Sequence, residues 1–255
     1  MNRYAITFQK LAGDGRIGFC PFAVLGNPDE KRTLERVQTY LENGADFLEL
    51  GIPFSDPIAD GPIIAAASEK ALKNGITTRR ALRLIKKIRR HVLHVPIGIL
   101  TYANIVIRYG IQKFYRDLSK AGADSLLIAD LPLEEIFPFT TAAKKNGIHQ
   151  IFLVSENTTL NRLKKIEKLG SGFLYVTSIL GVTGVRRRLP LHLAELIKKL
   201  RRATKLPLMV GFGISKAGHL NSLQRFGAQG GIVGSALVAT PIQKLPKILN
   251  SFRNP

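Results

Sequence analysis

The feature that most constrains the fold is an alternation of short apolar runs with helical patterns along the whole chain. Most of the runs are nearly continuous in apolar residues, which indicates strands covered on both faces, as in a parallel sheet. The expected strands are Phe19–Leu25, Phe47–Leu50, Ile97–Leu100, Ser125–Ala129, Gln150–Val154, Leu174–Thr177, Leu208–Val210 and Gly231–Val233.

Amphipathic helical patterns lie between these runs, and a first helix carrying Tyr4, Phe8 and Leu11 precedes them and ends at Gly13. Several helices end in a glycine suited to the C′ position and followed at once by the next strand. The other expected helices are about Lys31–Asn43, Ile111–Ala121, Pro138–Asn146, Thr159–Leu169, Leu193–Arg202 and Lys216–Phe226.

Eight strands alternating with helices over 255 residues, with no linker or low-complexity stretch, predict an α/β fold. We expect a single (β/α)₈ TIM barrel domain over residues 1–255, with an extra N-terminal helix. A doubly wound open sheet is the alternative. It would require a glycine-rich fingerprint after the first strand, where only Gly26 stands.

Composition limits where the protein works and what it binds. No apolar run reaches the ~18 residues of a membrane span and the N-terminus lacks a signal-peptide core, so a cytoplasmic protein is expected. The net charge of +20 raises nucleic acid as a partner. However, the lysines and arginines at 79–90 and 198–202 alternate with apolar residues at helical spacing and lack interleaved aromatic residues. This pattern favours solvated outer faces of helices.

Two carboxylates around the second strand are the strongest candidates for chemistry. Glu49 interrupts an apolar strand end, and Asp60 lies on the following loop, which contains three prolines that stiffen it and two glycines that allow tight turns. In a barrel the loops after the strands form the catalytic face. Although a turn or capping role explains each residue alone, together they predict a pair for acid/base catalysis.

Glycine-bearing turns follow the last three strands, at Gly181–Gly184, Gly211–Ser215 and Gly234–Ala236. Such turns let backbone N–H groups converge, and Ser235 is expected as the N-cap of a short helix whose N-terminus favours an anion. A phosphate site is therefore predicted. The five histidines show no metal-ligand spacing, and no lysine stands at a strand end for a Schiff base.

The segment Leu48–Pro62, read LELGIPFSDPIADGP, closely resembles the alpha chains of tryptophan synthase. The likeness continues through Tyr102–Asn104, Ala129–Pro132 and the three glycine turns. This resemblance implies a (β/α)₈ lyase that cleaves indole-3-glycerol phosphate to indole and glyceraldehyde 3-phosphate in tryptophan biosynthesis, without a metal or a cofactor in this chain.

The resemblance also assigns residues and a partner. Glu49 and Asp60 match the catalytic pair. The implied partner is a beta chain with pyridoxal phosphate, in an α₂β₂ heterotetramer. Substrate positions are Phe22, Leu100, Leu127, Tyr175, Thr183 and Ile232 around the indole and glycerol moieties, and Gly184, Gly213, Gly234 and Ser235 at the phosphate; partner contacts are Pro53, Asp56 and Asn104.

Two positions depart from the family pattern: Asn27 replaces an acidic residue, and Ile179–Leu180 stand where an arginine is common, in the expected lid. Two other hypotheses remain beside the lyase. The barrel could act mainly as an activator of a beta chain, which the intact Glu49 and Asp60 disfavour. It could also be a nucleic-acid-associated protein, which the outer-face position of the bases disfavours.

Overall fold

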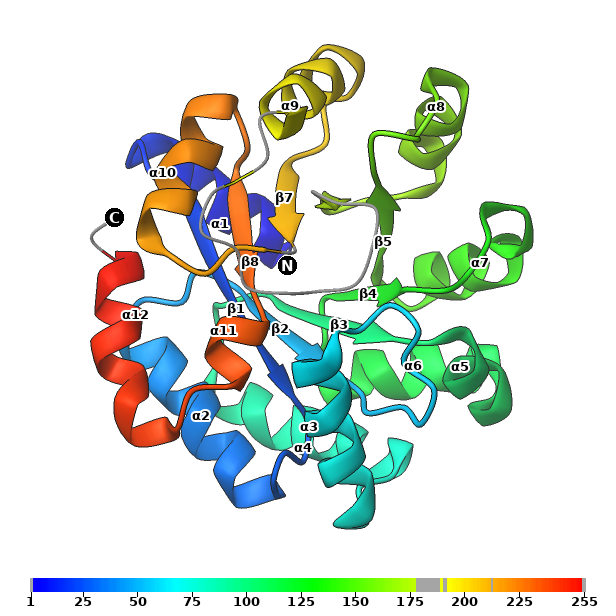
Figure 1. Ribbon diagram of the computed structural model, residues 1–255. Coiled ribbons are helices and arrows are strands. Elements are labelled where there is room, and N and C mark those ends of the chain that lie inside the picture. The colour runs from blue at the N-terminus through cyan, green and yellow to red at the C-terminus, as the bar shows by residue number, and fades with distance from the viewer. Residues whose placement is uncertain (1, 178–188, 190–191, 212, 254–255) are drawn as a thin grey trace.

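The computed structural model describes residues 2–177, 189, 192–211 and 213–253. Within them, eight parallel strands pair in chain order and the last pairs with the first, so the sheet closes into a barrel ringed by helices (Figure 1). The expected barrel is confirmed, and every predicted strand end lies within one residue of the observed one. The strands are β1 Gly18–Val24, β2 Leu48–Gly51, β3 Ile97–Thr101, β4 Ser125–Ile128, β5 His149–Val154, β6 Leu174–Thr177, β7 Leu208–Gly211 and β8 Gly230–Val233.

The helices cover the outside of this barrel and include the predicted N-terminal helix. Short 3₁₀ turns at Leu133–Glu135 and Ile242–Lys244 precede two of them. The helices are α1 Arg3–Gly13, α2 Glu30–Glu42, α3 Pro62–Lys73, α4 Thr78–His91, α5 Ala103–Tyr109, α6 Ile111–Ala121, α7 Phe137–Lys145, α8 Leu160–Leu169, α9 His192–Ala203, α10 Ala217–Phe226, α11 Ser235–Val238 and α12 Leu245–Arg253.

The near-continuous apolar runs are explained by burial on both faces of the sheet. Every residue of β1, β2, β4, β7 and β8 is buried. One set packs inside the barrel, including Leu127, Tyr175 and Ile232, and another packs outward against the helices, including Leu50 and Leu126. Because each strand is apolar on both sides, an ionisable group inside the barrel must have a particular role.

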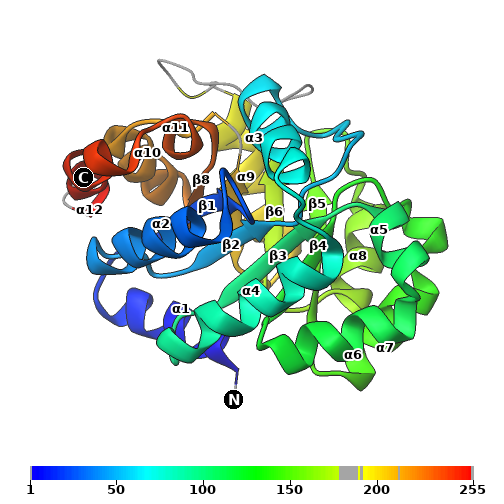
Figure 2. The same ribbon diagram turned by 90° about the horizontal axis from the view of Figure 1, so that it is seen from below.

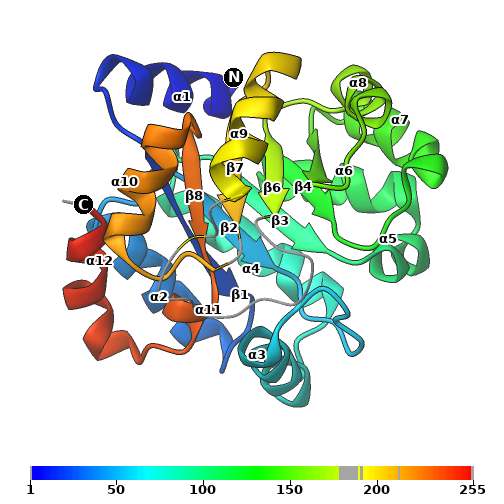
Figure 3. The same cartoon turned by 45° about the horizontal axis from the view of Figure 1, so that its top comes forward.

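Helix α1 closes the N-terminal end of the barrel. The Tyr4 ring stacks on Phe47 with centroids 5.8 Å apart, and Phe8 packs on the same ring at 4.9 Å. The Tyr4 hydroxyl is hydrogen bonded to the Ser125 hydroxyl at 2.8 Å, at the start of β4. Figures 2 and 3 show α1 and α3 at opposite ends of the barrel, so the loops after the strands lie away from this aromatic cap.

The strongly basic helices place their charges outward, as predicted. On α4 the apolar residues from Ala81 to Ile88 are buried, and on α9 the buried residues are Leu193, Leu196, Ile197 and Leu200. These helices are amphipathic covers of the barrel, with lysines and arginines on the other side. Of the helices in the described ranges, none is both long enough and apolar enough to cross a bilayer.

Candidate active site

Glu49 is the second of the four residues of β2, and it lies close to Cys20 and Tyr175 of the cluster inside the barrel. Its register partners are Phe22 on β1 and Gly98 on β3. The residue is only 6% exposed. No lysine or arginine pairs with it within the part of the chain that the structure describes. A carboxyl group this buried and without a cation has lost hydration that no ion pair replaces, so its neutral form is favoured.

The pKa of Glu49 reflects this environment. Burial, with a further contribution from the charge of Asp60, raises the pKa of Glu49 to about 8. At neutral pH the group therefore carries its proton and can donate it. A pKa near the working pH is also what allows one group to give and take a proton in a single cycle.

Asp60 lies on the loop that leads from β2 into α3. The loop folds back on itself, because the Asp60 amide donates to the Pro57 carbonyl at 3.0 Å and the Ile58 amide to the Asp56 carbonyl at 2.9 Å. Burial raises the pKa of Asp60 to about 6, against a hydrogen bond from Tyr102 that lowers it. Asp60 is therefore the more acidic member of the pair and ionises first.

Tyr102 is a site residue that the sequence analysis missed as a partner of Asp60. Directly after β3, it is 1% exposed, and its hydroxyl also accepts the Ala59 amide at 3.3 Å. The Phe54 ring stacks on Tyr102 with centroids 5.0 Å apart and is half-buried, so it fills space beneath its own loop. The sequence signals were its position as an aromatic residue at a strand end and its place in the matched segment Tyr102–Asn104, which gave it no role.

Apolar and aromatic side chains form the wall beside the carboxylates. Leu127, Tyr175 and Ile232 belong to one buried cluster inside the barrel, and the half-buried Leu100 packs against it. Phe22 is 3% exposed and lies one strand from Glu49. Burial and the charges of Glu49, Cys20 and Asp60 raise the pKa of Tyr175, so its hydroxyl stays protonated. Among the described residues, the structure thus brings those predicted around the indole and glycerol moieties together near Glu49.

The predicted phosphate residues lie at the ends of neighbouring strands. Gly213 follows β7 with φ of 78°, a conformation that favours glycine, and Gly234 follows β8. The expectation that Ser235 is an N-cap is wrong by one position: Gly234 is the N-cap, and Ser235 is the first residue of α11. Because the first amides of a helix lack partners within it, this turn still offers donors to an anion. Thr183, Gly184 and Ile179–Leu180 lie outside the described residues.

The predicted partner contacts differ in exposure. Asp56 and Asn104 are exposed, whereas Pro53 is buried. Asp56 accepts a hydrogen bond from the neighbouring Ser55 hydroxyl. Among the described residues no cluster of histidine, cysteine, aspartate and glutamate has the arrangement of a metal site.

Comparison with known proteins agrees with this geometry. The sequence pattern of the family "Tryptophan synthase alpha chain" matches residues 8–251. The chain is 44% identical over 235 residues to a tryptophan synthase alpha chain of Methanothermobacter thermautotrophicus, covering 92% of this chain and 86% of the relative. It is 41% identical over 254 residues to one of Francisella tularensis, covering 98% and 94%.

Solved structures give the same result. The tryptophan synthase subunit alpha of Legionella pneumophila superposes with a TM-score of 0.89 at 33% identity, covering 100% of this chain and 98% of the other. A chain of the tryptophan synthase α₂β₂ complex of Pyrococcus furiosus superposes with a TM-score of 0.87 at 37% identity, covering 93% and 98%. The chain belongs to the tryptophan synthase alpha chain family and is a lyase of tryptophan biosynthesis, which cleaves indole-3-glycerol phosphate to indole and glyceraldehyde 3-phosphate.

Proposed function

We propose that Glu49 and Asp60 carry this cleavage, with Glu49 as the proton-transfer group and Asp60 as the acceptor of the indole N–H. The observation that supports this assignment is the pair itself. Of two carboxyl groups, on β2 and on the loop after it, the charge of Asp60 acts on Glu49, and no cation neutralises either group among the described residues. Because they share a site without a cation, the two pKa values separate, and donor and acceptor roles can be divided between them.

The reaction follows from these states. Neutral Glu49 donates its proton to C3 of the indole ring, and the ionised Asp60 stabilises the positive charge that then develops at the ring nitrogen. The Glu49 carboxylate next takes the proton of the hydroxyl adjacent to C3. The bond from C3 to the glycerol chain breaks, its electron pair returns to the ring, and the released fragment is an aldehyde. Glu49 ends the cycle protonated.

The assignment of Asp60 is tested by comparing Asp60→Asn with Asp14→Asn. Asp14 is an exposed residue after α1, at the opposite end of the barrel. We expect Asp60→Asn to lower the rate of indole release at least about 10-fold, because general acid/base and charge-stabilising groups contribute on the order of 10²–10⁴-fold. Asp14→Asn should leave the rate unchanged. Equal rates in both variants would reject the role of Asp60.

For the phosphate, we propose backbone N–H groups at Gly213, Gly234 and Ser235, joined by the predicted Thr183 and Gly184. The test is Gly213→Ala against Gly15→Ala. Both glycines have positive φ, 78° and 62°, so both substitutions introduce similar backbone strain. Only Gly213→Ala should raise the Michaelis constant for the substrate. A Michaelis constant that rises equally in both would mean that the phosphate lies elsewhere.

We further propose assembly with a tryptophan synthase beta chain in an α₂β₂ heterotetramer, in which the pyridoxal phosphate belongs to the beta chain. The loop from Pro53 to Asp60 and the region of Asn104 form the contact. The support is that the exposed Asp56 lies on the same loop as Asp60, so a partner that orders this loop also positions a carboxylate of the site.

Asp56→Ala tests this coupling. Mixed with the beta chain, the wild-type protein should elute at larger size and release indole faster. Asp56→Ala should weaken both effects and leave the rate of the isolated chain nearly unchanged, and Asp14→Ala should behave as wild type. Co-elution without any change in rate would show that the loop binds but does not couple.

A further inference from the structure

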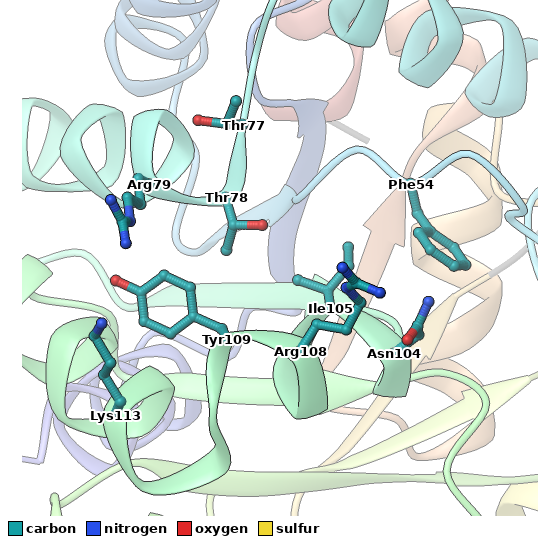
Figure 4. A pocket seen from close by; sticks show the side chains of 9 residues that line it. All are labelled: Phe54, Thr77, Thr78, Arg79, Asn104, Ile105, Arg108, Tyr109 and Lys113. Atoms are coloured by element: carbon teal, nitrogen blue, oxygen red, sulfur yellow. The ribbon is translucent and has the colours of Figure 1, made fainter.

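A surface cavity of about 560 Å³ lies beside the loop that carries Asp60. It opens between that loop, the start of α4, and the consecutive helices α5 and α6 (Figure 4). All of these segments follow strand ends or begin helices that lead back to the barrel, so the cavity belongs to the catalytic end. Its lining residues on α5 and on the loop include Asn104 and Phe54.

The lining of this cavity is cationic. Arg79, Arg108 and Lys113 contribute to it, and no carboxylate does. The charges gather around Tyr109: Lys113 Nζ lies 5.3 Å from the centre of its ring, and the charge of Arg79 acts on its hydroxyl. In Figure 4 Arg79 and Lys113 lie beside the Tyr109 ring, with Arg108 between Tyr109 and Phe54.

A second cavity of about 300 Å³ continues the first along α4 and α6, because both are lined by Arg79 and Tyr109. Its single carboxylate, Asp117, is already bonded to Arg116 at 3.1 Å and to the Tyr109 hydroxyl at 2.9 Å. We call the two cavities together the basic groove. Its cations are Arg79, Arg83, Lys86, Arg108, Lys113 and Lys120.

Three other cations of α4 have carboxylate partners. Arg80 and Lys87 pair with Glu30 at 3.0 and 3.1 Å, and Arg89 pairs with Asp124 at 2.6 Å. The α4 cations that line the groove make no ion pair with any residue in the described ranges. Apart from Arg90, the arginines and lysines of this helix without an ion pair among the described residues therefore lie on the side that faces α5 and α6.

We propose that the basic groove binds an acidic segment of the beta chain, an inference that rests on the proposed assembly. Arginine with an aromatic residue is the composition enriched in protein interfaces, and the guanidinium group binds carboxylates through two parallel hydrogen bonds. The groove is also continuous with the proposed contact, since Phe54 and Asn104 line it. A nucleic acid fits less well, because both aromatic rings of the groove are already engaged: Phe54 stacks on Tyr102, and Tyr109 contacts Lys113 and Asp117.

The experiment compares two double variants, Arg79→Glu with Lys113→Glu in the groove, and Lys199→Glu with Arg202→Glu on α9. All four residues are exposed and both variants change the net charge equally. Association with the purified beta chain is measured from ~50 to ~300 mM salt. Because exposed interface charges act mainly on association rates, we expect the groove variant to associate about 10-fold more slowly at low salt and the control less than about 3-fold. The basal rate of the isolated chain should be unchanged in both.

The outcomes separate this inference from the assembly itself. If the wild-type chain does not associate with the beta chain, the assembly and the groove proposal both fail. If it associates and the two variants slow equally, the assembly stands and the groove has no special role. If only the groove variant loses binding of a fluorescent single-stranded oligonucleotide while its association with the beta chain is intact, the groove is a nucleic-acid site and the proposal is overturned.

Discussion

Two buried carboxyl groups of the barrel, Asp124 and Glu49, are held in opposite ways. Asp124, just before β4, is 7% exposed and accepts hydrogen bonds from Arg3 at 2.8 Å, from Arg89 at 2.6 Å and from the Ile97 amide at 2.8 Å. Glu49 is 6% exposed and has no such cation among the described residues. Equal burial therefore has different consequences: the paired group fixes structure, and the unpaired group keeps a proton to transfer.

Glu49→Gln, which alters the unpaired group, should have the largest effect, on the rate of indole release. Glutamine has the shape of the neutral acid but no proton to transfer, so we expect indole release to fall about 10²–10⁴-fold. Thermal unfolding at pH 7 should show no loss of stability, because no ion pair is removed. A variant that keeps more than about a tenth of wild-type turnover would contradict the assigned role.

Asp124→Asn, which alters the paired group, should lower stability rather than activity. Removing one partner of a buried ion pair leaves the Arg89 guanidinium uncompensated, so we expect a loss of about 3 kcal/mol in the free energy of unfolding. Urea unfolding measures this loss, with the exposed Asp14→Asn as the control. Turnover per folded molecule should stay at the wild-type value. A stable variant that has lost activity would reverse the comparison.

The pH dependence of stability sharpens the comparison further. The pKa of Glu49 is raised in the folded protein, so the folded state holds a proton that the unfolded chain releases from about pH 4.5 upward. The contribution of Glu49 is thus complete below pH 4.5 and is lost as pH rises towards about 8. The melting temperature of wild type relative to Glu49→Gln should fall across this range. A constant difference would mean that Glu49 is not buried as a neutral acid.

Tyr102→Phe should have the smallest effect. Its hydrogen bond lowers the pKa of Asp60, so without it that pKa rises and the ionised form is reached only at higher pH. The acidic limb of the profile of kcat/KM against pH should therefore move upward, with a loss of under about 10-fold at pH 8. Tyr115→Phe, which removes a buried hydroxyl bonded to Gln150, should leave the limb in place.

Strand positions could be predicted because burial on both faces gives a strong local signal. Helices that the patterns did not reveal were α3, α5 and α12. The apolar and alanine-rich start of α3 has no clear polar side, and α5 is seven residues long and starts two residues after β3. Their positions depend on tertiary packing, which local periodicity does not record.

In the site, Glu49 was recognisable as a carboxylate within an apolar strand and Asp60 as an aspartate on a proline-rich loop, and in the structure the charge of Asp60 acts on Glu49. The contacts of Tyr102 and Phe54 were not predictable, because they join loops that are distant in the chain. From its place on a proline-rich loop Phe54 would be expected to be exposed, whereas its side chain is half-buried. The start of α11 was predicted one residue too late, with Ser235 as the N-cap, because helix ends depend on backbone conformation, which a glycine-serine pair does not specify.

The aromatic seal at α1 has a consequence for molecular traffic. Tyr4, Phe8 and Phe47 pack across the N-terminal end of the barrel. Their rings close the interior at that end, so that a molecule of the size of indole cannot pass through it. Substrate must therefore enter, and products must leave, at the C-terminal end of the barrel. The two products therefore share one exit. A partner bound over the loop of Asp60 would receive the indole as it leaves the site.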